Sequence, residues 1–209
     1  MSRLYLFSAA ASVAVLAGFM IFWIVTDGRS GGDPFAQCRT SAIAGGSGAI
    51  GGPFELVDHT GRTVTDADVL TRPSLLYFGY TFCPDVCPLD VDRNAVATDI
   101  VHELGYDLQP VFVSVDPERD TPEVLDRFVS NMHPDMIGLT GSDDQVRAAV
   151  RAYRVVAQRQ PGQDDEFYLV DHTTFSYLVL PAHGFVEVFR RELSADDMAN
   201  RMACFIGAS

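Results

Sequence analysis

Residues 74–88, with the sequence SLLYFGYTFCPDVCP, join an unbroken apolar run to two cysteines that stand four positions apart. A continuous apolar run of this length predicts a strand that is buried on both faces of a sheet. Proline disfavours helical backbone at the residue before it and is accepted at the first position of a helix. We therefore expect a helix to begin at Pro88, with Cys83–Cys87 forming a tight turn at its N-terminus.

The two thiols are the first candidates for chemistry. A position near the positive end of a helix dipole favours the thiolate over the thiol. Two such thiols can cycle between dithiol and disulfide, or they can bind a soft metal ion. Alternatively, the two cysteines are buried structural residues or form a static disulfide, and take no part in redox chemistry or metal binding. An exposed turn, which is where reactive thiols occur, favours the chemical interpretations.

The rest of residues 53–209 predicts an α/β domain with a sheet of mixed direction, because predicted strands and helices alternate before a final hairpin and helix. The expected strands are Phe54–Val57, Arg62–Thr65, Ser74–Phe82, Pro110–Val115, Ile137–Thr140, an edge strand Val155–Gln158, Phe175–Leu180 and Phe185–Arg190. The helix from Pro88 carries Leu89, Val96, Ile100 and Leu104 at helical spacing. Later helices are expected to begin at Thr121, at Ser142 and at the capping box Ser194-x-x-Asp197.

The N-terminus predicts a membrane anchor over residues 1–26. Leu4–Val25 is nearly uncharged and long enough to span a hydrocarbon core of about 30 Å. A cleaved signal peptide is the alternative, although its apolar region usually covers only about 7–15 residues. Trp23 suits the membrane interface. Residues 27–52 are rich in glycine and serine and predict a flexible tether to the globular domain.

The formal net charge of −13 argues against nucleic acid or an anionic membrane surface as a partner. The positive charge before the apolar run, from Arg3 and the amino terminus, exceeds that after it, from Arg29. This difference favours an N-terminus on the inner side of the membrane. In a bacterium the globular domain would then face the periplasm from the inner membrane, where disulfides persist.

A histidine that follows Cys87 by 85 positions is the third candidate donor. His172 lies in the polar segment 170–174, directly before the expected strand Phe175–Leu180. A loop beside a strand end can approach the N-terminus of a neighbouring helix. Two thiolates and one imidazole make a soft set of three donors, which suits Cu(I) better than zinc, a metal that normally takes four ligands. Asp171 is a candidate acceptor for orienting His172.

The remaining histidines and several methionines are expected to have no role at a site. We expect His59, His102, His133 and His183 to be solvated, and Met132, Met136, Met198 and Met202 to fill the core.

Three blocks together resemble the Sco/SenC family of copper proteins. They are Phe82–Pro88, Val115–Thr121 and Tyr168–Thr173, they occur in the family's order, and the similarity runs roughly from Gly52 to Ala203. The combination is far more specific than a pair of cysteines four positions apart.

The resemblance implies a thioredoxin-like fold, membrane-anchored on the periplasmic or intermembrane-space side. It also implies one copper ion bound by Cys83, Cys87 and His172, and a role in assembling the dinuclear copper centre of cytochrome c oxidase. Asp116 matches an acidic position of the family and is not expected to be a ligand. Arg119 and Asp120 are expected to hold their loop by ion pairing.

Two functions follow from these expectations. The first is a copper metallochaperone rather than a turnover enzyme, with the copper-bearing oxidase subunit as its partner. The second is a thiol–disulfide oxidoreductase in which Cys83 and Cys87 reduce the cysteines of the oxidase copper site. Other periplasmic copper carriers and thiol reductants are further candidate partners.

Cys38 and Cys204 lie outside the three blocks and complete an even number of cysteines. In an oxidising compartment they predict a disulfide that ties the tether to the terminal helix. Free thiols or a bridge between two chains are the alternatives.

Overall fold

The computed structural model describes residues 16–20, 23, 33–39, 49–84, 86–161 and 167–209. The chain divides into two compact units, Met1–Gln37 and Cys38–Ser209. In the first unit residues 16–20 and 23 are helical, and most of Leu4–Val25 lies outside the described residues. No helix within the described ranges is both long and apolar enough to cross a membrane. The anchor over residues 1–26 and the tether over 27–52 therefore stay predictions.

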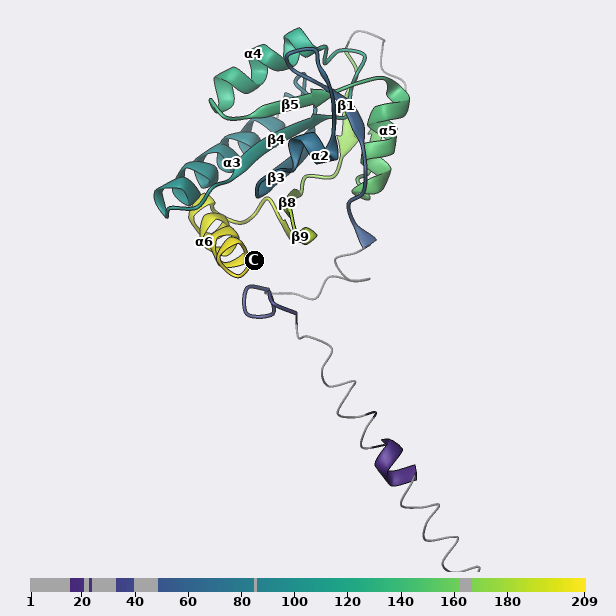
Figure 1. Cartoon of the computed structure of the whole chain (residues 1–209). Helices are drawn as coiled ribbons and strands as arrows, with labels where there is room; N and C mark the ends of the chain where they lie inside the picture. The colour runs from purple at the N-terminus through teal and green to yellow at the C-terminus, as the bar shows by residue number, and fades with distance from the viewer. Residues whose placement is uncertain (1–15, 21–22, 24–32, 40–48, 85, 162–166) are drawn as a thin grey trace, which may run out of the picture. The chain divides into compact units, whose positions relative to one another are not determined.

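The second unit is an α/β domain (Figure 1). Its strands are β1 Glu55–Asp58, β2 Thr63–Thr65, β3 Ser74–Gly79, β4 Gln109–Ser114, β5 Ile137–Thr140, β6 Ala157–Arg159, β7 Val170–His172, β8 Ser176–Leu180 and β9 Gly184–Phe189. Its helices are α2 Asp66–Val69, α3 Val86–Glu103, α4 Pro122–Met132, α5 Asp143–Ala152 and α6 Ala195–Gly207. The predicted caps are confirmed, because the side chains of Thr121, Ser142 and Ser194 each accept a backbone hydrogen bond at a helix start.

The central sheet has seven strands in the order β2-β1-β5-β4-β3-β8-β9. Strands β3, β4 and β5 are parallel, and the two predicted hairpins, β1–β2 and β8–β9, pair antiparallel. The mixed sheet is therefore confirmed. All six residues of β3 and all six of β4 are buried, as expected of strands covered on both faces.

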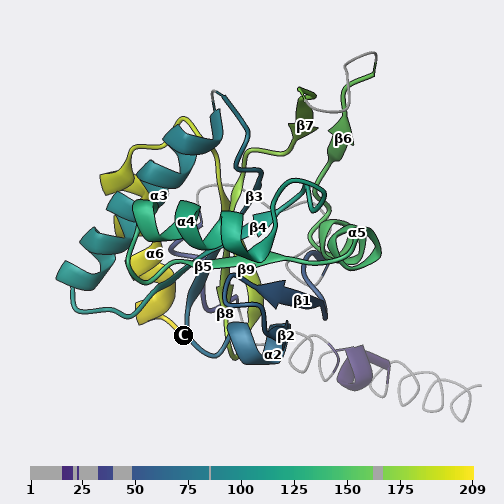
Figure 2. The same cartoon turned by 90° about the horizontal axis from the view of Figure 1, so that it is seen from above.

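Each face of the sheet carries its own core because side chains alternate along a strand. Leu76 and Phe78 of β3 point into a cluster that includes Val146 and Ala149 of α5. Tyr77, between them, points into the opposite cluster, which α3 and α4 cover. Helix α6 packs against α3, and the two lie side by side in Figures 1 and 2. The cysteine pair belongs to the cluster beneath α3.

The buried face of α3 differs from the expected one. Leu89, Val96 and Leu104, which stand at helical spacing, are 63%, 44% and 48% exposed. Helix α3 instead buries Cys87, Asp90, Val91, Asn94, Ala95, Ala97, Thr98 and Val101. The polar members of this face are tolerated because Asp90 and Asn94 accept hydrogen bonds from hydroxyl groups on β3 and β8. Apolar spacing therefore identified the helix but not the face that it buries.

The segment expected as an edge strand, Val155–Gln158, does not join the main sheet. Its counterpart β6 pairs antiparallel with β7, and the two form a separate ribbon. Figure 2 shows this ribbon beyond the ends of β3 and β4. The polar segment 170–174 is thus partly a strand, and β6 gives it the pairing partner that holds His172 in place.

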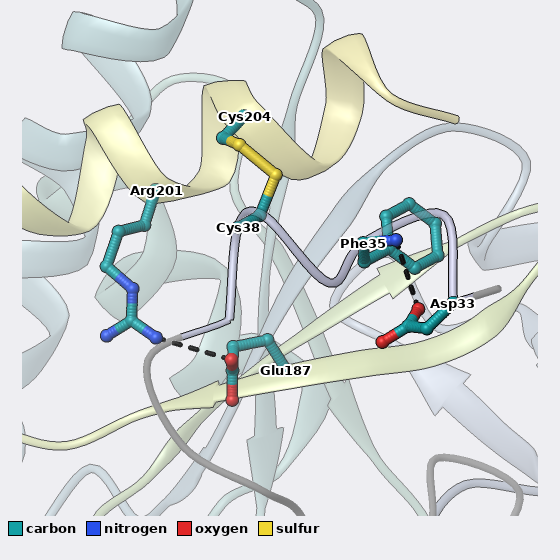
Figure 3. The surroundings of a disulfide bond; sticks show 6 residues. All are labelled: Asp33, Phe35, Cys38, Glu187, Arg201 and Cys204. Atoms are coloured by element: carbon teal, nitrogen blue, oxygen red, sulfur yellow. Dashed lines mark hydrogen bonds and ion pairs between the residues drawn. A yellow bond between two sulfur atoms is a disulfide. The ribbon is translucent and has the colours of Figure 1, made fainter.

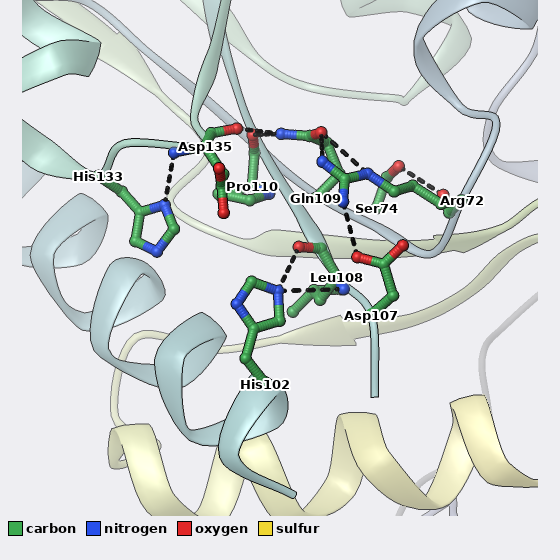
Figure 4. Close-up of polar contacts among 9 residues, drawn as sticks. All are labelled: Arg72, Ser74, His102, Asp107, Leu108, Gln109, Pro110, His133 and Asp135. Carbon is green, nitrogen blue, oxygen red and sulfur yellow. Dashed lines mark hydrogen bonds and ion pairs between the residues drawn. The ribbon is translucent and has the colours of Figure 1, made fainter. Parts of the chain in front are cut away.

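Three of the four other histidines are not the solvated side chains that we expected. His133 is 5% exposed, and its Nδ1 accepts a hydrogen bond from Asp135 N at 3.1 Å. His102 Nε2 lies 3.0 Å from the carbonyl oxygen of Leu108 (Figure 4). His59 Nδ1 accepts from Gly138 N at 3.2 Å. All three satisfy backbone groups at turns, while His183 is exposed as expected.

The predicted disulfide between Cys38 and Cys204 is confirmed (Figure 3). It joins residues that are 166 positions apart, at a Cα–Cα distance of 5.7 Å. Next to it, the guanidinium carbon of Arg39 lies 5.6 Å from the ring centroid of Phe205. The bridge fastens the start of the second unit to its terminal helix.

Candidate metal centre

Three donor side chains from two distant parts of the chain converge at the end of β3. Cys83 follows β3, Cys87 lies in α3 and His172 ends β7. Their donor atoms all lie within 4.8 Å of one another, and Cys87 Sγ is 3.1 Å from His172 Nε2. Within the described ranges this is the one group of three or more such side chains that could hold a metal ion. The expected approach of the histidine to the cysteine pair is therefore confirmed.

The position of Cys87 results from an earlier helix start than the prolines suggested. Helix α3 begins at Val86, so Cys87 stands in its first turn and Pro88 at its third position. Proline is tolerated there because the first turn of a helix needs no backbone donor at that point. Gly79 permits the close packing, because a Cβ at this position would lie 3.2 Å from Cys87 Sγ and 2.9 Å from a ring carbon of Tyr77.

Both sulfur atoms are buried, which corrects the expected exposed turn. Cys83 is 7% exposed and Cys87 is fully buried. Burial raises the pKa of the Cys87 thiol far above its ordinary value, and the nearby Cys83 raises it further. Desolvation thus outweighs the helix dipole that was expected to favour the thiolate. In the metal-free protein Cys87 is a thiol, and a metal cation must displace its proton.

The orientation of His172 suits coordination through Nε2. Its Nδ1 lies 3.1 Å from the carbonyl oxygen of Thr173, which a protonated Nδ1 can donate to. The lone pair of Nε2 then faces Cys87. Burial lowers the pKa of His172, so the neutral imidazole that metals require is favoured.

Asp171, the candidate acceptor for orienting His172, does not orient the ring. Its side chain is exposed and accepts a hydrogen bond from Gln160 Nε2 at 2.8 Å. Adjacent residues of a strand point to opposite faces, so Asp171 turns away from the side on which His172 meets Cys87. The backbone carbonyl of Thr173 instead lies where it can accept from His172 Nδ1.

Comparison with known proteins identifies the family. The family model described as SCO1/SenC matches residues 44–207. Protein SenC of Rhodobacter capsulatus is 48% identical over 202 residues, covering 96% of this chain and 89% of that protein. The chain belongs to the SCO1/SenC family. The human mitochondrial SCO1 homologue is 40% identical over 160 residues, and this chain spans only 53% of its length.

A solved structure of the same family contains copper. Arabidopsis thaliana ScoI with copper bound superposes with a TM-score of 0.73 at 39% identity, covering 77% of this chain and 100% of that one. The thioredoxin-like Sco fold that we expected is therefore confirmed for the α/β domain.

The donor set fits copper on its own chemistry. Two thiolates and one imidazole are soft to intermediate donors, and Cu(I) accepts three of them without a fourth ligand. The two thiolates would also supply the negative charge that a cation needs within a buried site, where an unpaired charge is costly; they balance Cu(II) and leave one negative charge in excess with Cu(I). Copper is thus the cofactor that both the family and the side chains indicate.

Asp120 ties the loop before Cys83 to the end of β4. It is fully buried, and it accepts hydrogen bonds from Thr81 N and Thr81 Oγ1 and from Ser114 Oγ. Burial raises the pKa of its carboxyl group, although the hydrogen bonds from Ser114 and Thr81 act in the opposite direction. The expected structural role is therefore present, but its partners are hydroxyl and amide groups rather than an arginine.

Arg119 makes the ion pair of this loop with Asp116 instead. Arg119 Nε lies 2.6 Å from Asp116 Oδ2, and Asp116 Oδ1 accepts from the Tyr168 hydroxyl at 2.5 Å. The guanidinium carbon of Arg119 also lies 3.6 Å from the ring centroid of Tyr168 and 4.9 Å from that of Phe82. Asp116 is thus engaged within the protein, in keeping with the expectation that it is not a ligand.

Replacing Asp120 with alanine is expected to loosen this loop. The substitution leaves Thr81 N and Ser114 Oγ without their acceptor, which should lower the free energy of unfolding by about 1–3 kcal/mol. Loss of a group that supports a ligand typically weakens metal binding about 10–100-fold. Urea denaturation and copper titration of the full-length chain would measure both effects.

The matched control for this variant is Asp126→Ala. Asp126 is an exposed carboxylate on α4, so its removal should change neither quantity. Wild-type stability and copper affinity in Asp120→Ala would show that the loop does not depend on this carboxylate.

Two tyrosines at the site were not predicted from the sequence. Tyr77 and Tyr80 are each 2% exposed, and each meets the His172 ring edge-on, with centroid distances of 6.1 and 5.8 Å. The apolar run marked them only as core residues. The available signal was chemical, because a buried tyrosine in a strand of aliphatic and phenylalanine side chains must find a partner for its hydroxyl.

Proposed function

We propose that this protein is a copper metallochaperone that delivers copper to the dinuclear copper centre of cytochrome c oxidase. The observation that carries the proposal is the convergence of Cys83, Cys87 and His172 within 4.8 Å. Family membership supports it, since a family member of known structure is described as copper-bound. Another solved structure, BsSco, is described as a member of the Sco family of cytochrome c oxidase assembly proteins.

In this proposal copper is cargo, and each donor has a distinct part. Cys87 loses its proton as the ion binds and supplies a buried thiolate. His172 binds through Nε2 while its other nitrogen donates to Thr173. Cys83 lies nearest the surface loop, where the exposed side chains of Phe82 and Pro84 flank it. It is therefore the donor that an incoming ligand of the oxidase subunit would displace first.

The second candidate function is reduction of the cysteines of the oxidase copper site. The observation that favours it is that Cys83 and Cys87 are unbridged, although their sulfur atoms lie within 4.8 Å. Attack by one thiolate on a disulfide of the partner would form a mixed disulfide and release one partner thiolate. Attack by the other cysteine would then release the second, leaving a Cys83–Cys87 disulfide.

Oxidase assembly in cells separates the two functions. Metal transfer requires all three donors, so His172→Ala and Cys83→Ala should reduce assembled oxidase equally. A dithiol–disulfide cycle requires both cysteines but tolerates loss of the imidazole, so His172→Ala should then be much milder. His133→Ala is the matched control, because this buried histidine contacts Asp99, His102 and Asp135 rather than any of the three candidate ligands. Full oxidase assembly in both Cys83→Ala and His172→Ala would refute both functions.

We also propose that the chain is held at the bacterial inner membrane by residues 1–26, with the α/β domain in the periplasm. The disulfide supports an oxidising compartment, because such bonds persist there. A solved structure from Bacillus anthracis is described as a SCO1/SenC family lipoprotein. Cell fractionation followed by protease treatment of spheroplasts would test the location.

A further inference from the structure

Arg119 contacts both of the segments that lead into the candidate ligands, although it follows β4 and belongs to neither segment. Its guanidinium carbon lies 4.9 Å from the ring centroid of Phe82, which is the residue before Cys83. The same carbon lies 3.6 Å from the ring centroid of Tyr168, in the segment that leads into β7 and His172. One side chain therefore meets the cysteine loop and the histidine segment together.

On the cysteine side, Arg119 and Asp120 hold three consecutive residues. The guanidinium carbon of Arg119 lies 5.6 Å from the ring centroid of Tyr80 as well as against Phe82. Between these two rings, Asp120 accepts hydrogen bonds from Thr81 N and Thr81 Oγ1. A guanidinium over an aromatic face is attracted most strongly where water is excluded, and the Arg119 side chain is only 13% exposed.

On the histidine side, Asp116 fixes the guanidinium against the ring of Tyr168. Arg119 Nε lies 2.6 Å from Asp116 Oδ2, and the Tyr168 hydroxyl donates to Asp116 Oδ1 at 2.5 Å. Each carboxylate oxygen thus takes one partner, so the ring and the guanidinium are held as a pair. A second contact joins the same two segments, because Val170 N donates to the Tyr80 hydroxyl at 3.3 Å.

These contacts require an arginine rather than any cation. A guanidinium is flat, so it can lie over a ring while its edge pairs with a carboxylate, whereas a lysine ammonium is a compact point charge. Within the described residues, Arg119 Nη2 is buried without a hydrogen-bonding partner, which is a costly arrangement. The rings and the Nε ion pair therefore set the position of this side chain.

We propose that Arg119 is a positioning residue of the copper centre, which holds the cysteine loop and the histidine segment at the spacing that the metal requires. This inference rests on the proposed copper-binding function and deepens it. Donors from two segments far apart in the sequence form one site only while those segments stay in place, and supporting contacts of this kind affect metal affinity. Arg119 acts through Phe82 and Tyr168, not by donating to the ion.

The test is the substitution Arg119→Lys in the full-length chain. Lysine keeps the positive charge beside Asp116 but loses the flat group that spans the two rings. Copper affinity should fall about tenfold or more, as it does when the support of a ligand is removed. Spin resonance should show one Cu(II) species in the wild type and more than one in the variant, because the ligand spacing is no longer fixed. A role in overall stability alone would leave the spectrum of the folded protein unchanged.

Arg159→Lys is the matched control. The guanidinium carbon of Arg159 lies 3.8 Å from the same Tyr168 ring, but Arg159 belongs to β6, which pairs with β7 on the histidine side. This substitution alters stacking on the same ring and leaves the link to Phe82 in place. The single Cu(II) species and the copper affinity of the wild type should therefore be kept. Near-ultraviolet circular dichroism would verify that each variant is folded.

Phe82→Leu keeps the proposal testable if Arg119→Lys does not fold. Phe82 is 55% exposed, so its replacement should not unfold the domain, yet it removes one of the rings that Arg119 contacts. It should produce additional Cu(II) species by itself. In the Arg119→Lys background it should add little, because the two side chains act through one contact. Additive effects of the two substitutions, or an unchanged spectrum in Phe82→Leu, would overturn the proposed contact.

Failure of this inference is distinct from failure of the proposed function. Folded Arg119→Lys with wild-type copper affinity and a single Cu(II) species would refute the positioning role alone. Equal effects of Arg119→Lys and Arg159→Lys would refute the assigned link between the two segments. Wild-type protein that binds no copper would refute the proposed function, and this inference with it.

Discussion

Cys87→Ala is expected to lower the copper affinity of the full-length chain by more than about 100-fold. Removing a group that only supports a ligand already lowers metal affinity about 10–100-fold, and Cys87 is itself a proposed ligand. Its sulfur lies 3.1 Å from His172 Nε2 and accounts for one of only two thiolates that the site offers. Anaerobic competition against a chromophoric Cu(I) chelator would measure the affinity and the stoichiometry of one copper per chain.

The control for this experiment is a variant in which Cys38 and Cys204 are both replaced by alanine. It removes two sulfur atoms that form a disulfide elsewhere in the domain, and it should keep one copper per chain. Wild-type affinity in Cys87→Ala would contradict the proposed ligand set, and hence the proposed function.

The second large effect is expected from the disulfide. Replacing Cys38 and Cys204 together should lower the free energy of unfolding by about 2–5 kcal/mol. The bridge closes a loop of 166 positions, and closing a long loop restricts the unfolded chain most. Urea denaturation of the copper-free protein, monitored by circular dichroism, would measure the loss.

A double variant of Cys83 and Cys87 serves as the matched control for stability. It removes the same number of sulfur atoms but breaks no covalent link, because these cysteines are unbridged. It should therefore be destabilised less than the variant lacking Cys38 and Cys204. Equal unfolding midpoints for the wild type and the disulfide-free variant would contradict a stabilising bridge.

Local patterns predicted the fold well wherever one interaction dominates. Thr121, Ser142 and Ser194 mark helix starts because their side chains accept a backbone hydrogen bond that has no other partner there. The runs that became β3 and β4 predicted buried strands because only strands covered on both faces are continuously apolar.

The predictions failed where two local preferences competed with packing. The prolines suggested that α3 begins at Pro88, yet the helix starts at Val86 because proline is tolerated throughout a first turn. Leu89 shows the same limit. It stands at helical spacing from other apolar residues, yet it is exposed, because the face of α3 that packs on the sheet is the one whose polar groups find hydrogen-bonding partners there. The strand β7 was missed although its partner β6 was expected as an edge strand, because β7 has only three residues and two of them, Asp171 and His172, are polar.

The sequence by itself identified the three candidate donors and their chemical character. Cys83, Cys87 and His172 were identified as candidates from residue type, spacing and resemblance, and a soft set of three donors suits Cu(I). The pairing of Cys38 with Cys204 followed in the same way from cysteine count and compartment.

Only the tertiary structure decided the environment of those donors. Burial, which depends on how α3 packs over Gly79, keeps Cys87 protonated in the metal-free protein and reverses the expectation from the helix dipole. The separate hydrogen-bonding partners of Tyr77 and Tyr80 likewise arise from contacts between distant segments. The physical reason is that donor chemistry belongs to each side chain, whereas desolvation and hydrogen bonding belong to its surroundings.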